Sequence, residues 1–454
     1  MSAQSATPID ARSRVDALLR IFADVRPGEG GRLLALSANV FLILTAYYVM
    51  KPVREVLILE QPGGAELKSY AYAMQAVLLM ALIPLYSGLA TSLPRRRLIN
   101  VVTAFFVACL PVFYMLAEAR TSIGIVFFLW IGIFSLMVIA QFWAYANDVY
   151  TVDAGKRLFA FIAFGASSGA VFGAWLSGHL IRTLGINPLL LAAAVILALS
   201  LLLFNLVDLY ARDERPAGHR TAADVDIGAG NAFALLLKSR YLTVMALAIL
   251  LLNWVNSAGE YILSAIVKRS ADAAVLAGTI AAGAEGRYIG AFFADYFQLV
   301  NVIGMALQLF VVARVVGWLG VPVALCILPV VALGSYTIAA LIPTLAMVRW
   351  IKTAENAVDY SLMNTVRQML FLPTTREEKF KAKQVIDSFV VRVGDVLSAL
   401  TVYLGTAVFA LSVSQFAWIN VALVLVWLAL SVVTGIGFRR RMARQSETAV
   451  PASA

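Results

Sequence analysis

The stretch NPLLLAAAVILALSLLLFNLVDLY, at residues 187–210, decides the fold. Residues 187–207 carry no charged side chain, and an α-helix of that length, at about 1.5 Å per residue, is about 30 Å long. The hydrocarbon core of a lipid bilayer has about the same thickness. We therefore predict that this stretch crosses a membrane as a helix.

The composition of the whole chain agrees with this prediction. Of its 454 residues, 61% are hydrophobic and only 14% are charged, and the mean hydropathy is +0.85. Soluble domains have about 45–50% apolar and about 25% charged residues. The excess excludes a soluble enzyme, a disordered protein and a nucleic-acid binder, despite the net charge of +10. The chain is predicted to be an integral membrane protein.

Similar apolar runs recur along the sequence and predict twelve transmembrane helices. They lie at residues 33–59, 69–92, 98–118, 121–146, 158–183, 187–210, 241–266, 288–313, 317–341, 343–366, 385–410 and 413–437. Around them we expect a cytosolic lead-in at 1–30, a six-helix bundle at 31–210, a linker at 211–240, a second bundle at 241–438 and a tail at 439–454. The linker is rich in Pro, Gly and charged residues, which favours a break between two bundles.

The two halves also show a faint internal repeat. VMKPVREVLIL at Val49–Leu59 can be aligned with WVNSAGEYILS at Trp254–Ser264, which places Glu55 over Glu260. Asp148, near the end of the fourth span, likewise matches Asp359 in the tenth. Two related six-helix halves are the plan of the major-facilitator superfamily. We predict an all-α integral membrane protein with twelve transmembrane helices in two pseudo-symmetric six-helix bundles.

Basic residues orient the predicted helices. Most of the 36 Lys and Arg fall in loops on the side of the N-terminus, and few fall on the opposite side. The residues on the opposite side are Lys68, Arg120, Arg182, Lys268, Arg269 and Arg287. Because cytoplasmic loops carry the excess of Lys and Arg, both termini are predicted to be cytoplasmic.

Charged residues inside the predicted spans are candidates for function, since each costs about 2.5–3.5 kcal/mol at a helix centre. The first span holds Lys51, Arg54 and Glu55, where Lys51 and Glu55 can pair at i,i+4 spacing. This group is either a substrate site or a snorkelling cluster at the end of the span. Glu260 and Asp295, in the seventh and eighth spans, supply carboxylates that can neutralise the cations of an empty site.

The tenth span carries the clearest pattern. Arg349, Lys352, Glu355 and Asp359 recur at spacings of three, three and four, which places them on one stripe of a helix. A stripe of cations and anions cannot comfortably face lipid. It either lines a site for an anionic substrate or forms a structural network of ion pairs.

Two further patterns concern packing and gating. Gly165, Gly169 and Gly173 form a GxxxGxxxG ladder, which lets two helices approach closely. In the eleventh span Arg392 and Asp395, at i+3 spacing, are expected to form an intrahelical pair or a gate. The two cysteines suggest no disulfide framework, and the two histidines have no partners at ligand spacing. We predict no metal, no cofactor and no enzymatic activity.

Two longer stretches carry a resemblance to a known family. The first is FWAYANDVYTVDAGKRLFAFIAFGASSGAVFG at Phe142–Gly173, and the second runs from KTAENAVDYSL to KAKQVIDSFVVRVG at Lys352–Gly394. Their motifs FWxxAN, TxDxxKR and GAxxG, and then DYSL, LP and KxKxKxxID, resemble the nucleotide transporters of plastids and intracellular bacteria. These ATP/ADP antiporters are distant relatives of the major facilitators.

The resemblance implies an exchanger of nucleotides or similar phosphorylated anions that works by alternating access. Charged residues that are important to transport in that family match Lys51 or Arg54, Lys156 or Arg157, Glu260, and Lys352 or Arg367. The expected substrate-binding residues are Lys51, Arg54, Glu55, Asn147, Asp148, Lys156, Arg157, Glu260, Arg349, Lys352, Glu355 and Asp359. We expect a monomer in a bacterial inner (cytoplasmic) membrane, with the lipid bilayer and an anionic small molecule as partners and no nucleic acid.

Two other functions stay open on the sequence. A proton-driven exporter of another small molecule would need the same buried charges, with Glu260 or Asp359 coupled to protons. A non-transporting membrane sensor would keep the fold without using Lys51 or Lys352 for transport.

Overall fold

The computed structural model describes residues 16, 19, 20, 24–26, 28–211, 232–375 and 377–449. Most of the predicted lead-in at 1–30, most of the linker at 211–240 and the last residues of the tail lie outside the described residues. The predicted division of the chain into these segments therefore stays a prediction.

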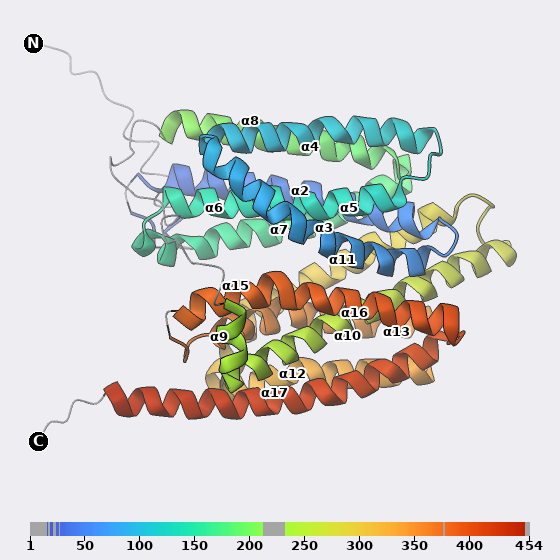
Figure 1. The fold of residues 1–454 in the computed structure, drawn as a ribbon. Helices are drawn as coiled ribbons and strands as arrows, with labels where there is room; N and C mark the ends of the chain where they lie inside the picture. The colour runs from blue at the N-terminus through green and yellow to red at the C-terminus, as the bar shows by residue number, and fades with distance from the viewer. Residues whose placement is uncertain are drawn as a thin grey trace, which may run out of the picture. The chain divides into compact units, whose positions relative to one another are not determined.

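The described residues form helices connected by short loops (Figure 1). The first half contains α2 (Gly30–Leu59), α3 (Gly64–Ser92), α4 (Arg95–Glu118), α5 (Gly124–Phe134), η1 (Ser135–Ile139), α6 (Ala140–Val149), α7 (Val152–Leu184) and α8 (Pro188–Ala211). The second half contains α9 (Ala232–Lys238), α10 (Arg240–Leu276), α11 (Glu285–Phe310), α12 (Val312–Leu341), α13 (Leu345–Val358), η5 (Asp359–Met363), α14 (Asn364–Met369), η6 (Glu378–Ala382), α15 (Lys383–Val385), η7 (Ile386–Val390), α16 (Val391–Tyr403), η8 (Leu404–Val408) and α17 (Val413–Ala449). The η segments are π-helical.

Within the described residues, nine helices are long and apolar enough to cross a membrane. They are α2, α4, the α5–α6 run, α7, α8, α10, α11, α12 and α17. The other three predicted spans, 69–92, 343–366 and 385–410, correspond to α3, the α13–α14 run and the α15–η8 run. These segments are helical, but the count of twelve transmembrane helices stays a prediction. The all-α membrane fold itself is confirmed.

The chain divides into two compact units, and the division falls inside α2. Unit 1 comprises residues 1–54, 86–123 and 130–224, and unit 2 comprises residues 55–85, 124–129 and 225–454. Arg54 therefore belongs to unit 1 and the adjacent Glu55 to unit 2.

In unit 1, α7 packs against α2 through the glycine ladder. A Cβ added at Gly169 would lie 2.3 Å from the Phe41 backbone oxygen, and one at Gly173 would lie 2.6 Å from the Thr45 oxygen. Because no side chain larger than hydrogen fits there, the two backbones are in direct contact. The spacing of the glycines predicts this close approach correctly.

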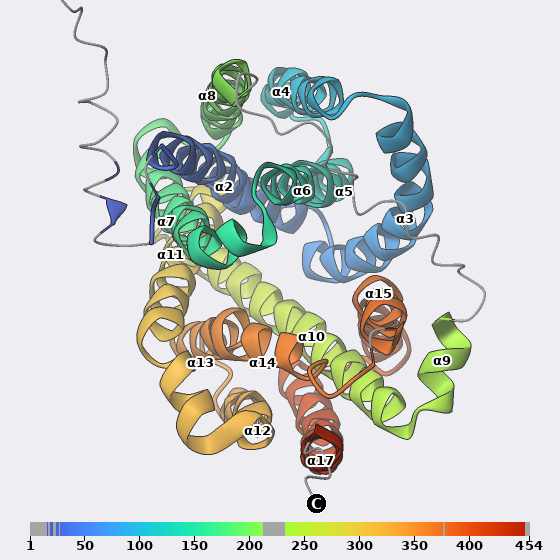
Figure 2. The same cartoon turned by 90° about the vertical axis from the view of Figure 1, so that its left-hand side faces the viewer.

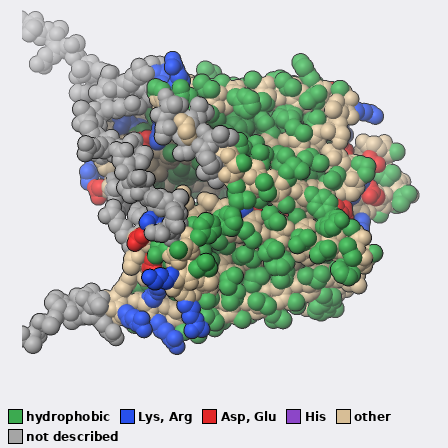
Figure 3. Space-filling model, in the orientation of Figure 1, with side chains coloured by type: hydrophobic (Ala, Val, Ile, Leu, Met, Phe, Trp, Pro, Cys, Tyr) green, Lys and Arg blue, Asp and Glu red, His purple; other side chains and the backbone are tan. Residues whose placement is uncertain are grey.

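In unit 2, α10 is the central helix and packs against α11, α13, α16 and α17. α12 and α17 lie side by side in both views (Figures 1 and 2). Hydrophobic side chains cover the visible middle of this unit, and Lys and Arg gather at the end where α17 ends (Figure 3). The polar residues of α10 and α13 face each other inside this apolar frame, and that arrangement positions the site.

Candidate functional site

One face of α10 carries a row of polar side chains along a helix that is otherwise apolar. Asn253, the adjacent Asn256 and Ser257, Glu260 and Ser264 recur every three or four residues along the helix, which places them on one side of it. This side faces α3, α13 and α16, as the hydrogen bonds and ion pairs below show.

The second half of the site comes from α13 and the π-helical segment that follows it. Lys352, Glu355 and Asn356 are buried, Arg349 and Asp359 are half-buried, and Asp359 begins η5. The predicted charged stripe is thus present on α13. π-Helical turns occur frequently at functional sites, and this one interrupts α13 one turn after Glu355.

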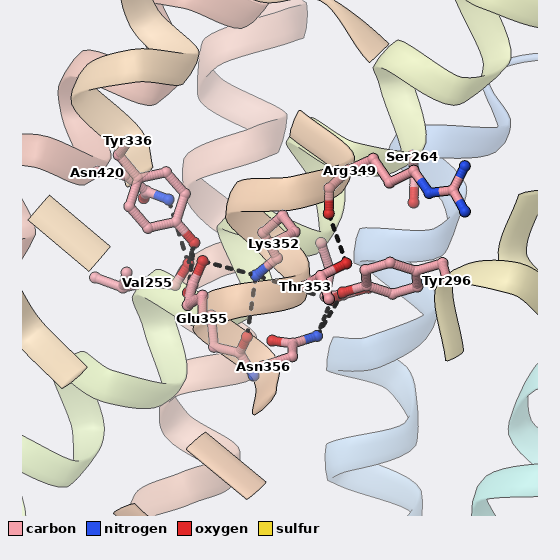
Figure 4. Close-up of polar contacts among 12 residues, drawn as sticks. Val255, Ser264, Tyr296, Tyr336, Arg349, Lys352, Thr353, Glu355, Asn356 and Asn420 are labelled. Atoms are coloured by element: carbon pink, nitrogen blue, oxygen red, sulfur yellow. Dashed lines mark hydrogen bonds and ion pairs between the residues drawn. The ribbon is translucent and has the colours of Figure 1, made fainter. Parts of the chain in front are cut away.

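Lys352 lies at the centre of a buried ion-pair network (Figure 4). Its Nζ is 3.2 Å from Glu355 Oε2 and 3.9 Å from Glu260 Oε1. It also donates a hydrogen bond of 3.3 Å to Asn256 Oδ1. The ammonium group therefore has three oxygen neighbours from α10 and α13, which offset the desolvation of its charge.

A second buried lysine, Lys68 of α3, lies on the other side of Glu260. Its Nζ is 2.7 Å from Glu55 Oε2 and 3.4 Å from Glu260 Oε2, and it donates to Ser264 Oγ at 2.9 Å. It also lies 5.3 Å from the centre of the Phe293 ring. Glu260 therefore bridges the two lysines, with one carboxylate oxygen directed at each.

Tyrosine and asparagine side chains hold the carboxylates in place (Figure 4). The Tyr336 hydroxyl donates to Glu355 Oε1 at 2.9 Å. Asn356 Nδ2 donates to Glu260 Oε1 at 3.2 Å and to the Tyr296 hydroxyl at 2.6 Å. These bonds fix the rotamers of both glutamates, since a buried polar group without a partner is unfavourable.

The ion pairs among these three glutamates and two lysines are of two kinds. Glu55 with Lys68 and Glu355 with Lys352 are the shorter, more buried pairs. Glu260 makes the longer contacts, at 3.4 and 3.9 Å, and its side chain keeps 14% of its surface exposed. Of the three carboxylates, Glu260 therefore has the longest ion-pair distances and the most exposed side chain.

A smaller polar cluster joins α10 to α16. Asp395 Oδ1 accepts hydrogen bonds from Ser257 Oγ at 2.7 Å and from Asn253 Nδ2 at 3.0 Å. Arg392 lies 3.4 Å from Asp395 Oδ2, so the expected intrahelical pair is present. With three partners, Asp395 fixes α16 against α10.

The structure brings together four of the residues predicted from sequence, namely Glu55, Glu260, Lys352 and Glu355. Arg349, at the start of the stripe, lies 5.9 Å from the centre of the Phe292 ring. In unit 1, Lys51 and Arg54 are buried. The Lys51 Nζ lies 4.7 Å from the centre of the Tyr48 ring.

The predicted residues of the α6–α7 connection lie elsewhere in unit 1. Asn147 and Asp148 are exposed, and Asp148 forms an ion pair with Arg95. Arg157 pairs with Glu29 at 3.1 Å, beside the start of α2. Lys51 is 22 residues beyond Glu29, which is about 33 Å along a helix. Arg157 and Lys51 therefore do not form one site, and the Lys156 side chain lies outside the described atoms.

Sequence reasoning missed Lys68, which it placed in a loop. α3 begins at Gly64, before the predicted span at 69, so Lys68 is helical and buried. Asn256, Tyr296, Tyr336 and Asn356 were also missed as site residues. The spacing of the polar residues on α10 was the available signal for Asn256, whereas Tyr296 and Tyr336 have no signal distinct from ordinary aromatic packing.

Comparison with known proteins identifies the fold. No protein-family model and no curated protein sequence matches the chain. Among solved structures, a bacterial homologue of the human lysosomal transporter Spinster, inward-facing and unoccupied, is similar with a TM-score of 0.62 and 14% identity, over 92% of this chain and 98% of that one.

Two other structures are similar over most of their length. The nucleoside transporter NupG has a TM-score of 0.59 and 13% identity, over 90% of this chain and 99% of that one. A bacterial homologue of the iron transporter ferroportin, inward-facing, has a TM-score of 0.61 and 12% identity, over 89% and 98%. At such low identity the likeness defines the fold, and the chain has a major-facilitator-like fold. Membership of the ATP/ADP antiporter family stays a prediction.

Proposed function

We propose that the protein is a secondary transporter that moves nucleotides or related phosphorylated anions across a membrane by alternating access, in exchange for a like anion. The observation that carries this proposal is the position of Glu260 between the buried ammonium groups of Lys68 and Lys352. Support for a transport role comes from the similar structures, which are transporters of a nucleoside and of other small solutes.

In the proposed mechanism the substrate phosphate replaces the Glu260 carboxylate. Glu55 and Glu355 keep the closer contacts with Lys68 and Lys352, so both lysines stay paired throughout. A phosphate oxygen can take each position now held by a Glu260 oxygen, and Asn356 Nδ2 can donate to it as it does to Glu260. In the empty state Glu260 occupies these positions again. Neither lysine is therefore left as a bare buried charge, which would be strongly unfavourable.

This arrangement also favours exchange. In the empty state Glu260 of α10 bridges Lys68 of α3 and Lys352 of α13 and so joins three helices, and a phosphate that displaces Glu260 releases this bridge. We expect the loaded transporter to change conformation faster than the empty one, and that difference produces exchange. Lys51 and Arg54 belong to unit 1, and their role in binding stays a prediction.

Binding measurements on the purified full chain test the proposal. ATP, ADP, inorganic phosphate and the uncharged nucleoside uridine are compared by their effect on thermal unfolding, because a ligand of the folded state raises its stability. Phosphorylated compounds should stabilise the protein and uridine should not. In Glu260→Gln, which lacks the internal competitor, nucleotide affinity should rise about tenfold, the change that about 1.4 kcal/mol produces.

The matched control is Asp272→Asn, which removes a carboxylate near the C-terminal end of α10. Asp272 pairs with Lys268 at the surface, and its side chain is half exposed, so nucleotide affinity should not change. Equal affinity in Glu260→Gln and wild type, or stabilisation by uridine alone, would contradict an anion site at Glu260.

The second candidate function is a proton-coupled exporter. The observation that favours it is the number of carboxylates in the buried ion-pair network. Three carboxylates face two ammonium groups in the network, and carboxylates inside the membrane serve as proton carriers in transporters. In that case Glu260→Gln abolishes transport driven by a proton gradient and leaves ligand affinity unchanged. The same variant therefore separates the two functions.

A further inference from the structure

A cavity of about 810 Å³ lies in unit 2 at the end where α10 begins and α17 ends. Short helix α9, the first turn of α10 and the last turns of α17 form its walls, together with Glu378 of η6. It is far along α10 from the buried site, because about 20 residues separate Arg240 from Glu260, or about 30 Å of helix. The proposed transport site does not use it.

The cavity is strongly cationic. Its lining includes five basic residues, Lys238, Arg240, Arg440, Arg441 and Arg444, and Glu378 is the acidic residue among those that line it. Lys and Arg side chains gather visibly at this end of the unit (Figure 3). The surplus of positive charge makes the cavity a site for an anion.

Arg441 gives the cavity a fixed wall. Its guanidinium group lies 3.1 Å from Glu378 Oε2 and donates to Ser239 Oγ at 2.9 Å. It also lies 4.8 Å from the centre of the Tyr241 ring. Glu378 therefore pairs with Arg441, one of the five basic residues that line the cavity.

The same cavity also presents apolar side chains. Val433 and Ile436 line it and are exposed, with 43% and 46% of their surface accessible. They belong to the apolar part of α17, which gives way to Arg439–Arg441 directly afterwards. That change from apolar to basic residues marks the level where lipid acyl chains meet the headgroups.

We infer that this cavity binds the headgroup of an anionic phospholipid. Lys238, Arg240 and Arg440 hold the phosphate, and Val433 and Ile436 contact the adjoining acyl chain. Basic pockets at the membrane surface bind such headgroups, and the apolar wall favours a lipid over a soluble phosphate because the latter has nothing to place against it.

Native mass spectrometry of the purified full chain tests this site. The probes are dioleoyl phosphatidylglycerol, dioleoyl phosphatidylcholine and soluble glycerol 3-phosphate. We expect retention of phosphatidylglycerol in preference to phosphatidylcholine, and no retention of glycerol 3-phosphate. In Arg240→Gln/Arg440→Gln, phosphatidylglycerol affinity should fall about 25-fold, since each Lys or Arg near the surface contributes about fivefold.

The control variant is Arg287→Gln/Arg314→Gln, which removes two exposed cations of unit 2 that do not line the cavity. Its phosphatidylglycerol affinity should equal that of the wild type. Equal losses in the two double variants would show diffuse attraction to charge and overturn the site. Binding of glycerol 3-phosphate as tight as that of the lipid would also overturn it, in favour of a soluble anion.

Discussion

Replacing Lys352 with methionine should destabilise unit 2 through the carboxylate that it leaves behind. Glu355 is buried, and its Oε2 lies 3.2 Å from the Lys352 Nζ. At that distance, with an effective dielectric constant of about 20, the attraction is about 5 kcal/mol before desolvation is subtracted. Removing one partner of a buried pair typically costs about 3–5 kcal/mol, because the other charge stays buried.

A double-mutant cycle isolates this interaction. Glu355→Gln removes the orphaned charge, so the double variant Lys352→Met/Glu355→Gln should be more stable than Lys352→Met alone, with a coupling energy of at least about 2 kcal/mol. Reversible unfolding of the full chain in mixed micelles, followed by tryptophan fluorescence, provides the free energies.

The chain offers a matched control in the exposed pair Lys268–Asp272. These residues are 2.6 Å apart at i,i+4 spacing, with 28% and 50% of their side chains exposed. The cycle Lys268→Met/Asp272→Asn should give only about 0.3–0.5 kcal/mol. A coupling energy at Lys352 and Glu355 as small as at this control would refute a tightly paired network.

Two further predictions concern unit 1. Burial alone would raise the pKa of Glu29, but hydrogen bonds from Arg157 and the Arg26 amide, together with their charges, lower it below its usual 4.5. The stabilisation is therefore present above the ordinary pKa and is lost as pH falls through the lowered one. The free energy of unfolding, measured as the pH is lowered, should show this loss in the wild type and not in Glu29→Gln. In a separate experiment, Gly169→Leu should force α7 from α2 and lower the unfolding midpoint, because its Cβ would lie 2.3 Å from the Phe41 oxygen, whereas Gly88→Leu, in open space, should not.

Much of the fold followed from the sequence because membrane burial leaves strong local signals. Long uncharged runs predict the apolar helices. The spacing of Lys352, Glu355 and Asp359 predicts a charged stripe on one face of their helix, and this prediction does not depend on which helix packs against it. Glu260 was found for the same reason, since a lone carboxylate in an apolar run is costly unless it has partners.

The partners themselves were less accessible to sequence reasoning. Glu55 pairs with Lys68, 13 residues away and on another helix, and such a contact depends on how α2 and α3 pack. The π-helical segment η5 could not be predicted either, because a shift of backbone hydrogen bonds depends on the neighbouring helices. Arg157 matched a family motif, yet its observed partner Glu29 belongs to the lead-in, where the sequence showed no sign of a contact.

Nucleotide exchange in liposomes tests the central claim most directly. The full chain is reconstituted into vesicles loaded with unlabelled ADP, and entry of labelled ATP is measured without a proton gradient. The account predicts uptake that requires internal nucleotide and that Lys68→Met and Lys352→Met both abolish, whereas the Lys268→Met control transports normally. Uptake that ignores internal nucleotide, or that persists in both lysine variants, would contradict an anion site between Lys68 and Lys352.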